Sequence, residues 1–525
     1  MSKAKKLSPY EIEIFNNILG SIAEEMGTML IRAAYSPNIK ERRDLSCALF
    51  EENGEMVSQA AHIPVHLGSM SFAVKSVLSE LDLSEGDVLI VNDPYRGGTH
   101  LPDITIIAPF FYKNKIEYFL ASRAHHADVG GITPGSMPLS KSIYEEGVII
   151  PPSKLYSRGK INRKLFNNII NSTRDPEERK GDFNAQIGAV NLGLKRLREV
   201  VDKYSLSKIR AASDQLLEYS ERMMRVVVKD IENGSYEFAD YLDGDGFSPK
   251  KIKIKVKITI KGSKATVDFS GTDKQVEGCL NCPLSVTTSA VLYVFQCLAP
   301  KELPLNSGSL RPVKIVTEKG TVIDAEYPSA VAGGNVETSQ RIVDVVFGAL
   351  SKAIPDKVPA ASAGTMSNVT FGGRVRKGNG KFAYYETIAG GMGARNGMDG
   401  ISAVQTHMTN TLNTPIESLE RELPILVDSY SIRKNSGGKG RYSGGDGIVR
   451  GYKFLTDVTV TLITDRRKTS PYGIKGGANA KPGRNSVVIN GRKKALPAKT
   501  TMSLKKGSVL TIETPGGGGW GTKII

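Results

Sequence analysis

The stretch from Asn92 to Asp128 places the strongest constraint on how this chain can fold. Its two ends are polar clusters, and between them two runs of β-branched and aromatic residues flank the short segment Tyr112-Lys113-Asn114. Two such runs joined by a short polar turn predict a β-hairpin. The clusters contain three of the six histidines in 525 residues, together with three aspartates: His100, His125, His126, Asp93, Asp103 and Asp128.

The predicted hairpin brings these two polar clusters together. With a turn centred on Lys113 and Asn114, opposed residues have numbers that sum to about 227, and their side chains lie about 5 Å apart. Asp103 is then expected opposite Ala124, near His125. A register slip of one or two residues changes which histidine points inward, but the clusters still meet at the open end of the hairpin.

Two interpretations of this meeting point remain open from spacing alone. Two or three histidines with one or two carboxylates form the kind of donor set that binds a divalent metal ion. The alternative is a polar hairpin base in which the histidines only form hydrogen bonds.

Length and composition predict a large α+β fold. At about 150 residues per domain, a chain of 525 residues corresponds to two to four domains or to one composite fold. Residues 172–233 are charged, periodic and poor in glycine and proline, which predicts helices. We therefore expect a helical α+β N-terminal half, residues 1–235, that contains the candidate metal site. A β-rich C-terminal half, residues 236–525, is expected to have mixed or antiparallel sheets and inserted helices.

The sequence contains no predicted membrane or secretion segment. Apolar residues never run for the roughly 18 positions that a membrane span needs. Four glutamates near the N-terminus interrupt any signal-peptide core: Glu11, Glu13, Glu24 and Glu25. We expect a soluble, cytoplasmic protein with no membrane partner.

The net charge of +16 does not by itself predict a nucleic-acid partner. Such partners are bound by basic residues clustered with aromatic ones, and the lysines here are not arranged in that way. In the densest run, 250–258, lysine alternates with β-branched residues. This alternation is typical of a half-buried strand with a lysine-rich solvent face, and it suggests a sheet edge.

Other motifs predict no second chemistry. Cys279 and Cys282 lack the second pair that a structural zinc site needs, so we interpret them as structural thiols. The glycine-rich segments contain neither a phosphate-binding P-loop nor a G-x-S-x-G nucleophile motif. If the reaction needs ATP, the sequence predicts that this chain does not bind it in a P-loop.

For several polar residues the sequence leaves two possible roles open. The charged run Asn38–Asp44 leads into a predicted strand, so it is either a solvated surface or the lining of a cleft. His62 and His66 are as suited to packing as to metal binding. His407 lies in a polar run and belongs either to a second site or to the surface.

Long motifs in this sequence resemble those of the hydantoinase B family. These proteins are subunits of N-methylhydantoinases, 5-oxoprolinases and acetone or acetophenone carboxylases. The resemblance covers nearly the whole chain, and the segments that carry it are 38–44, 92–103, 122–131, 134–138, 333–338, 405–417, 442–447 and 514–521.

The resemblance implies a metal site. In the carboxylase branch a manganese ion is bound by Glu, His, Asp and His, and the matching positions here are Glu41, His100, Asp103 and His125. His126 and Asp128 lie next to His125, and Asp44 competes with Glu41. Such a mixed nitrogen and oxygen donor set suits Mn²⁺, with Zn²⁺ or Fe²⁺ as alternatives.

The resemblance also implies a division of labour between two subunits. A larger hydantoinase A-type partner, similar to actin-like ATPases, is expected to bind ATP and phosphorylate the substrate, and this chain then acts on the product within a hetero-oligomer. His100, Asp103 and His125 are the expected catalytic residues, and Arg96, Arg123 and His126 the expected substrate-binding residues. Arginine suits this role because its guanidinium binds phosphate or carboxylate bidentately.

The length of the chain favours the branch that hydrolyses cyclic amides, hydantoin or 5-oxoproline, because the carboxylase subunits are longer. An acetone-type carboxylase and a non-catalytic assembly subunit for the ATPase remain the alternatives. No motif indicates which cyclic amide is the substrate.

Overall fold

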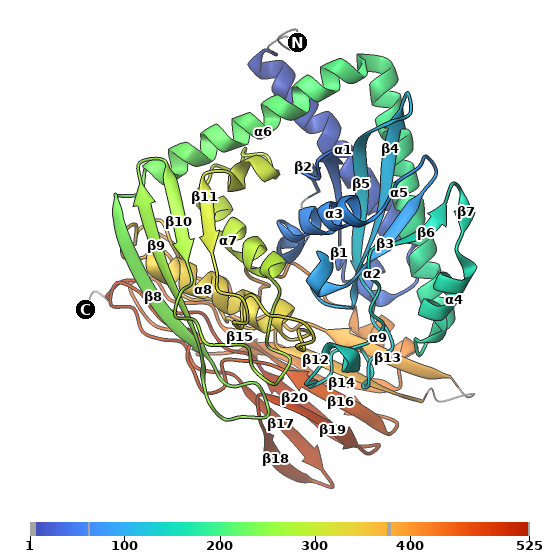
Figure 1. Ribbon diagram of the computed structural model, residues 1–525. Helices are drawn as coiled ribbons and strands as arrows, with labels where there is room; N and C mark the ends of the chain where they lie inside the picture. The colour runs from blue at the N-terminus through green and yellow to red at the C-terminus, as the bar shows by residue number, and fades with distance from the viewer. Residues whose placement is uncertain (1–6, 61–62, 375–379, 523–525) are drawn as a thin grey trace.

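The first half of the protein is built around a seven-stranded antiparallel sheet. The computed structural model describes residues 7–60, 63–374 and 380–522, and Figure 1 shows it as a ribbon. The strand order is β2-β1-β5-β4-β3-β6-β7. The strands are β1 (Leu45–Glu51), β2 (Met56–Gln59), β3 (Val88–Val91), β4 (Asp103–Tyr112), β5 (Lys115–His125), β6 (Ser153–Ser157) and β7 (Lys160–Ile161).

Helices cover both faces of this sheet. One face packs against α1 and α5 through a core that includes Phe15, Leu19 and Phe183, and the other packs against α3 through Met70 and Val74. The long α6 runs across the top of the view in Figure 1 and leads to the second half. The helices of this half are α1 (Pro9–Ala33), α2 (Pro37–Lys40), α3 (Ser69–Glu80), α4 (Arg163–Asn171), α5 (Pro176–Tyr204) and α6 (Leu206–Lys229).

Helix α1 illustrates how the sequence specifies these elements. Pro9 occupies the first turn, where its missing N–H is not needed, and Glu11 Oε2 accepts a hydrogen bond from the Ser8 backbone N–H at 3.0 Å. The apolar stripe of the helix, from Phe15 to Leu30, is buried against the sheet.

The predicted hairpin is present as β4 and β5, but its register differs by one residue from the prediction. Lys113 and Asn114 both have positive φ, as a two-residue hairpin turn requires. Next to the turn the paired residues follow the predicted register, Tyr112 with Lys115. An irregularity at Phe110 then shifts the register, so that Asp103 pairs with His125 rather than with Ala124. A β-bulge adds one residue to one strand, which explains the difference.

The second half contains three sheets, as the prediction of a β-rich region requires. A four-stranded sheet has the order β11-β10-β9-β8, and two further sheets have the orders β13-β12-β16-β19 and β14-β15-β20-β17-β18. The strands are β8 (Gly234–Leu242), β9 (Ile252–Lys261), β10 (Lys264–Asp268), β11 (Val313–Val316), β12 (Asn368–Arg374), β13 (Lys381–Glu386), β14 (Ile425–Arg433), β15 (Gly447–Phe454), β16 (Val458–Ile463), β17 (Arg484–Ile489), β18 (Arg492–Leu496), β19 (Lys499–Leu504) and β20 (Val509–Glu513).

Two separate cores stabilise these sheets. The last two sheets enclose a common apolar core that includes Phe371, Tyr452 and Leu510. The β8–β11 sheet packs instead against α8, and α7 joins the same apolar core among the helices of this half. These helices are α7 (Leu284–Leu298), α8 (Ser339–Leu350) and α9 (Ile416–Glu422). The α+β fold class predicted from the sequence is confirmed.

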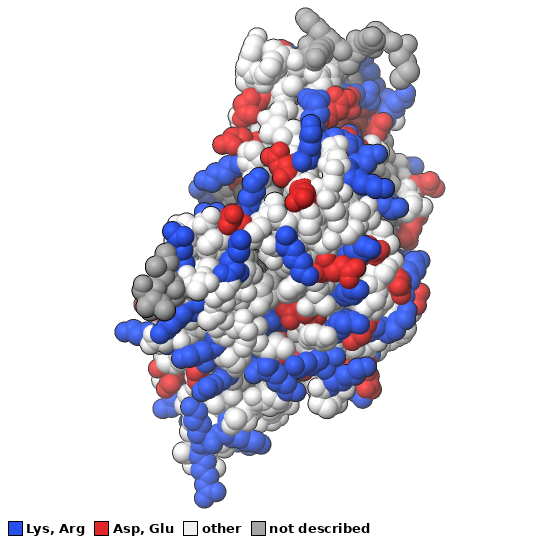
Figure 2. All heavy atoms as spheres, turned by 90° about the vertical axis from the view of Figure 1, so that its left-hand side faces the viewer, with Lys and Arg blue, Asp and Glu red and all other residues white. Residues whose placement is uncertain are grey.

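The lysine-rich run forms the strand β9, and its residues alternate between buried isoleucine or valine and more exposed lysine. This part of the prediction is correct, but the suggested edge position is wrong, because β9 lies between β8 and β10. Figure 2 shows Lys and Arg side chains spread over this side of the molecule with Asp and Glu among them.

The expected boundary near residue 235 falls where α6 ends and β8 begins. One apolar core nevertheless includes residues from both sides of it, such as Val65 and Met224 from the first half and Val256 and Val343 from the second. The division into 1–235 and 236–525 therefore stays a prediction. No helix among the described residues is long and apolar enough to cross a membrane.

Candidate functional site

Three side chains from the hairpin converge at its open end. Asp103 Oδ1 lies 3.0 Å from His100 Nε2 and 3.1 Å from His125 Nδ1. The two ring nitrogens are 3.2 Å apart, and all three side chains are buried. The predicted meeting of the two polar clusters is therefore present in the structure.

Local structure explains why these side chains meet. Asp103 is the first residue of β4 and His125 the last of β5, so they form a directly opposed pair. The loop before β4 supplies His100, and Asn92 fixes that loop because its Nδ2 donates to Leu101 O at 2.8 Å. Gly97 in this loop has a φ of 92°, and a Cβ there would lie 2.5 Å from the backbone of Phe72. Only glycine allows such a close approach.

Two residues outside the hairpin join the cluster. His66 Nε2 lies 3.3 Å from Asp103 Oδ2, and Asn335 Nδ2 donates to the same oxygen at 3.2 Å and contacts His100 Nε2 at 3.1 Å. The sequence left open whether His66 packs in the interior or binds a metal ion. Asn335 lies in a glycine-rich segment whose role was not predicted. Only the three-dimensional fold brings them here. The other histidine of that pair, His62, lies outside the described residues.

Burial and charge act in opposite directions on these groups. Burial alone would raise the pKa of Asp103, but the charge of His100 and hydrogen bonds from the histidines hold that pKa well below its usual value. Burial acts to lower the pKa of His100, yet the Asp103 carboxylate raises it overall. For His125 burial wins and lowers the pKa. Asp103 is therefore a carboxylate in the folded protein.

The donor atoms fit a divalent metal ion. Three ligand atoms about 3.0 Å apart match neighbouring corners of an octahedron with bonds of about 2.1 Å, and two histidines with one carboxylate form a known facial set. His100 Nδ1 lies 3.3 Å from Ala332 O, so in the neutral ring its N–H donates there and the Nε2 lone pair faces Asp103. Facing lone pairs repel one another unless a proton or a cation lies between them.

A small cavity of about 20 Å³ adjoins this cluster, which is room for one water molecule. Its lining includes His66, Asp103 and His125 on one part of the wall. Tyr385 also lines it and stacks on the His125 ring, with the ring centroids 4.5 Å apart. The remaining lining residues are Asp44, Ile63, Val65, Asn335, Val336, Met366, Thr387, Met408, Thr409 and Thr411.

Glu41 is not brought together with the other expected ligands. The cluster of convergent donor groups among the described residues consists of His100, Asp103 and His125. Glu41 follows α2, and its carboxylate faces Ser418 and Glu422 of α9, so that burial and the charge of Glu422 raise its pKa. After a turn in which Arg43 has positive φ, the chain places Asp44 in the lining of the cavity. In position, Asp44 rather than Glu41 accompanies the cluster.

The adjacent residue His126 points to the other face of the sheet. Its Nε2 lies 2.8 Å from Gln186 Oε1, and its ring packs against Phe183 of α5. Burial and the charge of Arg179 lower its pKa to about 4, so it is neutral near pH 7. Asp128 is also directed elsewhere, because it forms an ion pair with Arg174 at 2.7 Å.

The two arginines expected to bind substrate lie away from the cavity lining. Arg96 is half exposed and forms ion pairs with Glu80 and Asp93 on the surface. Arg123 is buried and donates to Thr105, Ser69 and Gly97, so it ties the loop before β4 to the start of α3. Burial lowers the pKa of Arg123 to about 10. Arg123 therefore has a structural role, because it holds the loop that carries His100.

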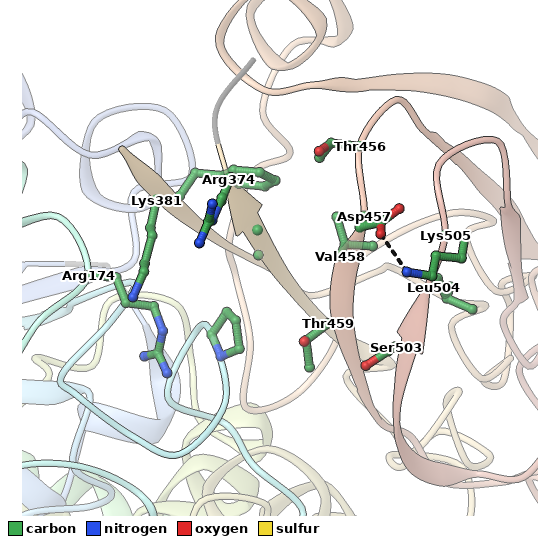
Figure 3. Close-up of a pocket in the computed structure, with 14 residues that line it drawn as sticks. Arg174, Arg374, Lys381, Thr456, Asp457, Val458, Thr459, Ser503, Leu504 and Lys505 are labelled. Atoms are coloured by element: carbon green, nitrogen blue, oxygen red, sulfur yellow. Dashed lines mark hydrogen bonds and ion pairs between the residues drawn. The ribbon is translucent and has the colours of Figure 1, made fainter. Parts of the chain in front are cut away.

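A larger surface pocket of about 500 Å³ does not contain this cluster. Figure 3 shows that Arg174, Arg374 and Lys381 lie on one side of it, and Asp457 and Lys505 form an ion pair of 2.8 Å on the other. None of the described residues that line it is a histidine or a cysteine. Its lining lacks the groups for acid–base or metal chemistry that converge at the hairpin.

Comparison with known proteins places the whole chain in one family. A family model described as hydantoinase B/oxoprolinase matches residues 8–523. The chain belongs to the hydantoinase B/oxoprolinase family. The resemblance inferred from the sequence motifs is thereby confirmed.

This chain covers nearly the whole of one relative but less than half of another. It is 45% identical over 517 residues to an uncharacterized protein of Methanocaldococcus jannaschii, with 97% of this chain and 90% of the relative covered. A 5-oxoprolinase of Dictyostelium discoideum is 40% identical over 525 residues, which is 99% of this chain but 41% of the relative. The family member thus spans about two fifths of the length of that 5-oxoprolinase.

Two solved structures have the same fold. An ATP-dependent caprolactamase from Pseudomonas jessenii matches with a TM-score of 0.91 and 27% identity, covering 99% of this chain and 92% of that chain. A nucleotide-free acetone carboxylase matches with a TM-score of 0.91 at 19% identity, covering 98% of this chain and 76% of that chain. The second likeness shows the fold alone.

Proposed function

We propose that this protein is the metal-binding component of an ATP-dependent enzyme that hydrolyses a cyclic amide, such as 5-oxoproline or a hydantoin. One observation carries the proposal: His100 Nε2, His125 Nδ1 and Asp103 Oδ1 converge within 3.2 Å of one another beside a small cavity. In a catalytic metal site, an open position next to the protein ligands receives water or substrate.

The choice of a cyclic amide is supported by the relatives. The 5-oxoprolinase and the caprolactamase are both named for cyclic amides, and both resemble this chain more closely in sequence than the acetone carboxylase does. A carboxylase remains the alternative prediction. The ATP requirement is supported by the name of the caprolactamase.

The metal ion is proposed to be Mn²⁺, with Zn²⁺ or Fe²⁺ as alternatives, held by His100, Asp103 and His125. When bound, it would supply Lewis-acid chemistry, polarising a substrate oxygen or lowering the pKa of water. His100 is oriented for this role by Ala332 O, and Asp103 by Thr99, whose hydroxyl donates to Oδ2 at 2.7 Å. Asp44 lines the same cavity, and its carboxylate is proposed to accept the proton of the attacking water.

ATP is proposed to bind to a larger partner that phosphorylates the substrate before this chain acts on it. Two observations support a partner: the glycine-rich segments contain no P-loop, and the chain spans two fifths of the 5-oxoprolinase.

Reconstitution with the partner tests this proposal. The chain is co-expressed with its large ATPase partner, and ATP-dependent ring opening of 5-oxoproline and of hydantoin is measured with the metal content of the complex. We expect stoichiometric metal and activity on one of these amides, and both should be lost in His100→Ala. Full activity of His100→Ala without metal would contradict a metal-dependent reaction and favour a non-catalytic assembly role.

A further inference from the structure

Arg42 is a fully buried guanidinium with no carboxylate partner among the described residues. Its Nη1 donates to Asn38 Oδ1 and Tyr385 O, both at 2.7 Å. Its Nη2 donates to the hydroxyl oxygens of Thr387 at 2.7 Å and Thr411 at 3.3 Å. Its Nε has no acceptor at all. A buried guanidinium that no carboxylate contacts is costly, and an anion bound nearby at some stage of the reaction would lower that cost.

Three hydrogen-bonded threonines connect Arg42 to the cavity beside the metal cluster. Thr387 Oγ1 lies 2.7 Å from Thr411 Oγ1, which lies 3.4 Å from Thr409 Oγ1. All three threonines are buried, and all three line the cavity that is also lined by His66, Asp103 and His125. Arg42 is not itself in the lining, so its influence reaches the cavity through these hydroxyls.

The direction of the hydrogen bonds leaves one proton for a ligand. Arg42 donates to the oxygens of Thr387 and Thr411, so the protons of these hydroxyls point away from the guanidinium. The three hydroxyls carry three protons, and the two contacts between them use two. One hydroxyl proton therefore remains to be donated to whatever occupies the cavity.

The charges around the cavity also favour an anion once a metal is present. Asp44 and Asp103, counted as carboxylates, and the guanidinium groups of Arg42 and Arg123 are all buried, and together their formal charges sum to zero without direct ion pairs between them. A divalent metal ion at His100, Asp103 and His125 then leaves the region with a surplus of about two positive charges. A ligand with two negative charges neutralises this surplus, and a phosphoryl group meets that requirement.

We propose that Thr387, Thr409 and Thr411, polarised by Arg42, form an oxyanion subsite that receives an oxygen of the substrate's phosphoryl group. The identity of this anion rests on the proposed function, since phosphorylation by the partner supplies it. The cavity of about 20 Å³ holds a single oxygen-sized group. Met366 and Met408 in the lining are unbranched and adaptable, so their side chains can move to admit the rest of the ligand.

Inorganic phosphate is the probe for this subsite. The purified protein is loaded with Mn²⁺, its metal content is measured, and phosphate is titrated calorimetrically. Paramagnetic broadening of the ³¹P signal then reports whether the phosphate lies near the metal. We expect saturable binding with broadening in the wild type, and affinity about tenfold lower in Thr411→Val, because a hydrogen bond to a charged ligand is lost.

Two further variants make the result interpretable. Thr409→Val removes the end of the hydroxyl chain without touching Arg42, so it decides the question if Thr411→Val does not fold. Thr414→Val is the matched control, because its buried hydroxyl accepts from Tyr384 at 3.1 Å and does not line the cavity. We expect Thr414→Val to bind phosphate with wild-type affinity.

The outcomes separate this inference from the proposed function. Wild-type phosphate affinity in Thr411→Val and Thr409→Val, or no phosphate binding by the metal-loaded wild type, overturns the subsite. Failure of the chain to take up metal overturns the metal-dependent function instead. Phosphate is then titrated without metal, and weaker binding is expected because the charge of the metal is missing. Affinity that is lower in Thr409→Val than in Thr414→Val supports the subsite, and equal affinity or no binding overturns it.

Discussion

Two buried polar clusters in this protein differ in how their charges are balanced. The metal cluster, His66, His100, Asp103 and His125, places one carboxylate among three imidazoles beside a cavity. The ionic cluster in the second half contains three carboxylates and three cations: Asp240, Asp344, Asp465, Arg341, Arg466 and Lys499.

The difference explains why one cluster is a candidate site and the other is structural. In the ionic cluster each cation lies against carboxylates, as in the contacts of Arg466 with Asp344 at 2.6 Å and with Asp240 at 2.7 Å. The charges cancel, and no external cation is needed. In the metal cluster, nitrogen and oxygen lone pairs face one another, and their neutralisation depends on an added proton or metal ion. A buried polar cluster is a candidate binding site when its own charges and hydrogen bonds do not neutralise one another.

The largest expected effect separates two neighbouring histidines. His125→Ala removes a metal ligand and should lower metal affinity by roughly a thousandfold, since a ligand accounts for a few kcal/mol of binding. His126→Ala is the matched control, because this side chain contacts Gln186 on the opposite face of the sheet. Elemental analysis and competition with a chelator measure both. Equal metal affinity in the two variants would show that His125 is not a metal ligand, and the metal cluster would then have no special need for a cation.

In the ionic cluster, the expected effect is on stability. Arg466→Met removes a cation that contacts both Asp240 and Asp344. Breaking a buried ion pair should lower the free energy of unfolding by about 3 to 5 kcal/mol. Denaturant unfolding followed by circular dichroism measures this loss, while metal content in native conditions should remain that of the wild type. A variant with normal stability but no metal would show that the ionic cluster serves the site.

A pH-dependent effect is expected at Glu146, a buried carboxylate with no cation partner among the described residues. Burial raises the pKa of Glu146 to about 7, so the folded state binds its proton more tightly than the unfolded state. The free energy of unfolding should therefore fall as pH rises from about 4.5 to 7, by up to about 3 kcal/mol.

Glu146→Gln lacks this titration and keeps an oxygen that can accept from Val331 N, Ala332 N and the Ser140 hydroxyl, as Glu146 Oε1 does. Its stability relative to the wild type should rise between pH 5 and pH 8, and denaturant unfolding at both pH values measures the change. A pH-independent difference between the two proteins would contradict the raised pKa.

The smallest expected effect concerns Asn335, which contacts both His100 and Asp103. Asn335→Ala removes an orienting hydrogen bond without removing a hairpin ligand, so metal affinity should fall about tenfold. Chelator competition measures the change. A loss as large as that of His125→Ala would make Asn335 a direct ligand, and no loss would exclude it from the site.

The local features of the sequence predicted much of the fold. Helix α1, the hairpin β4–β5 and the strand β9 follow from patterns that extend over a few residues, because capping, turn chemistry and alternation act locally. The hairpin was enough to predict that the two polar clusters meet, since its geometry holds even when the register changes by one residue, and the loop held by Asn92 adds His100 to the pair Asp103 and His125.

Only the tertiary structure decided the other members of the site. The bulge near Phe110 set which residue lies opposite Asp103. Packing of α5 against one face of the sheet directed His126 away from the cluster, and a turn at Arg43 placed Asp44 instead of Glu41 at the cavity. His66, Asn335 and the threonines reach the cavity from distant parts of the chain. Their approach depends on long-range packing, and no local pattern in the sequence encodes it.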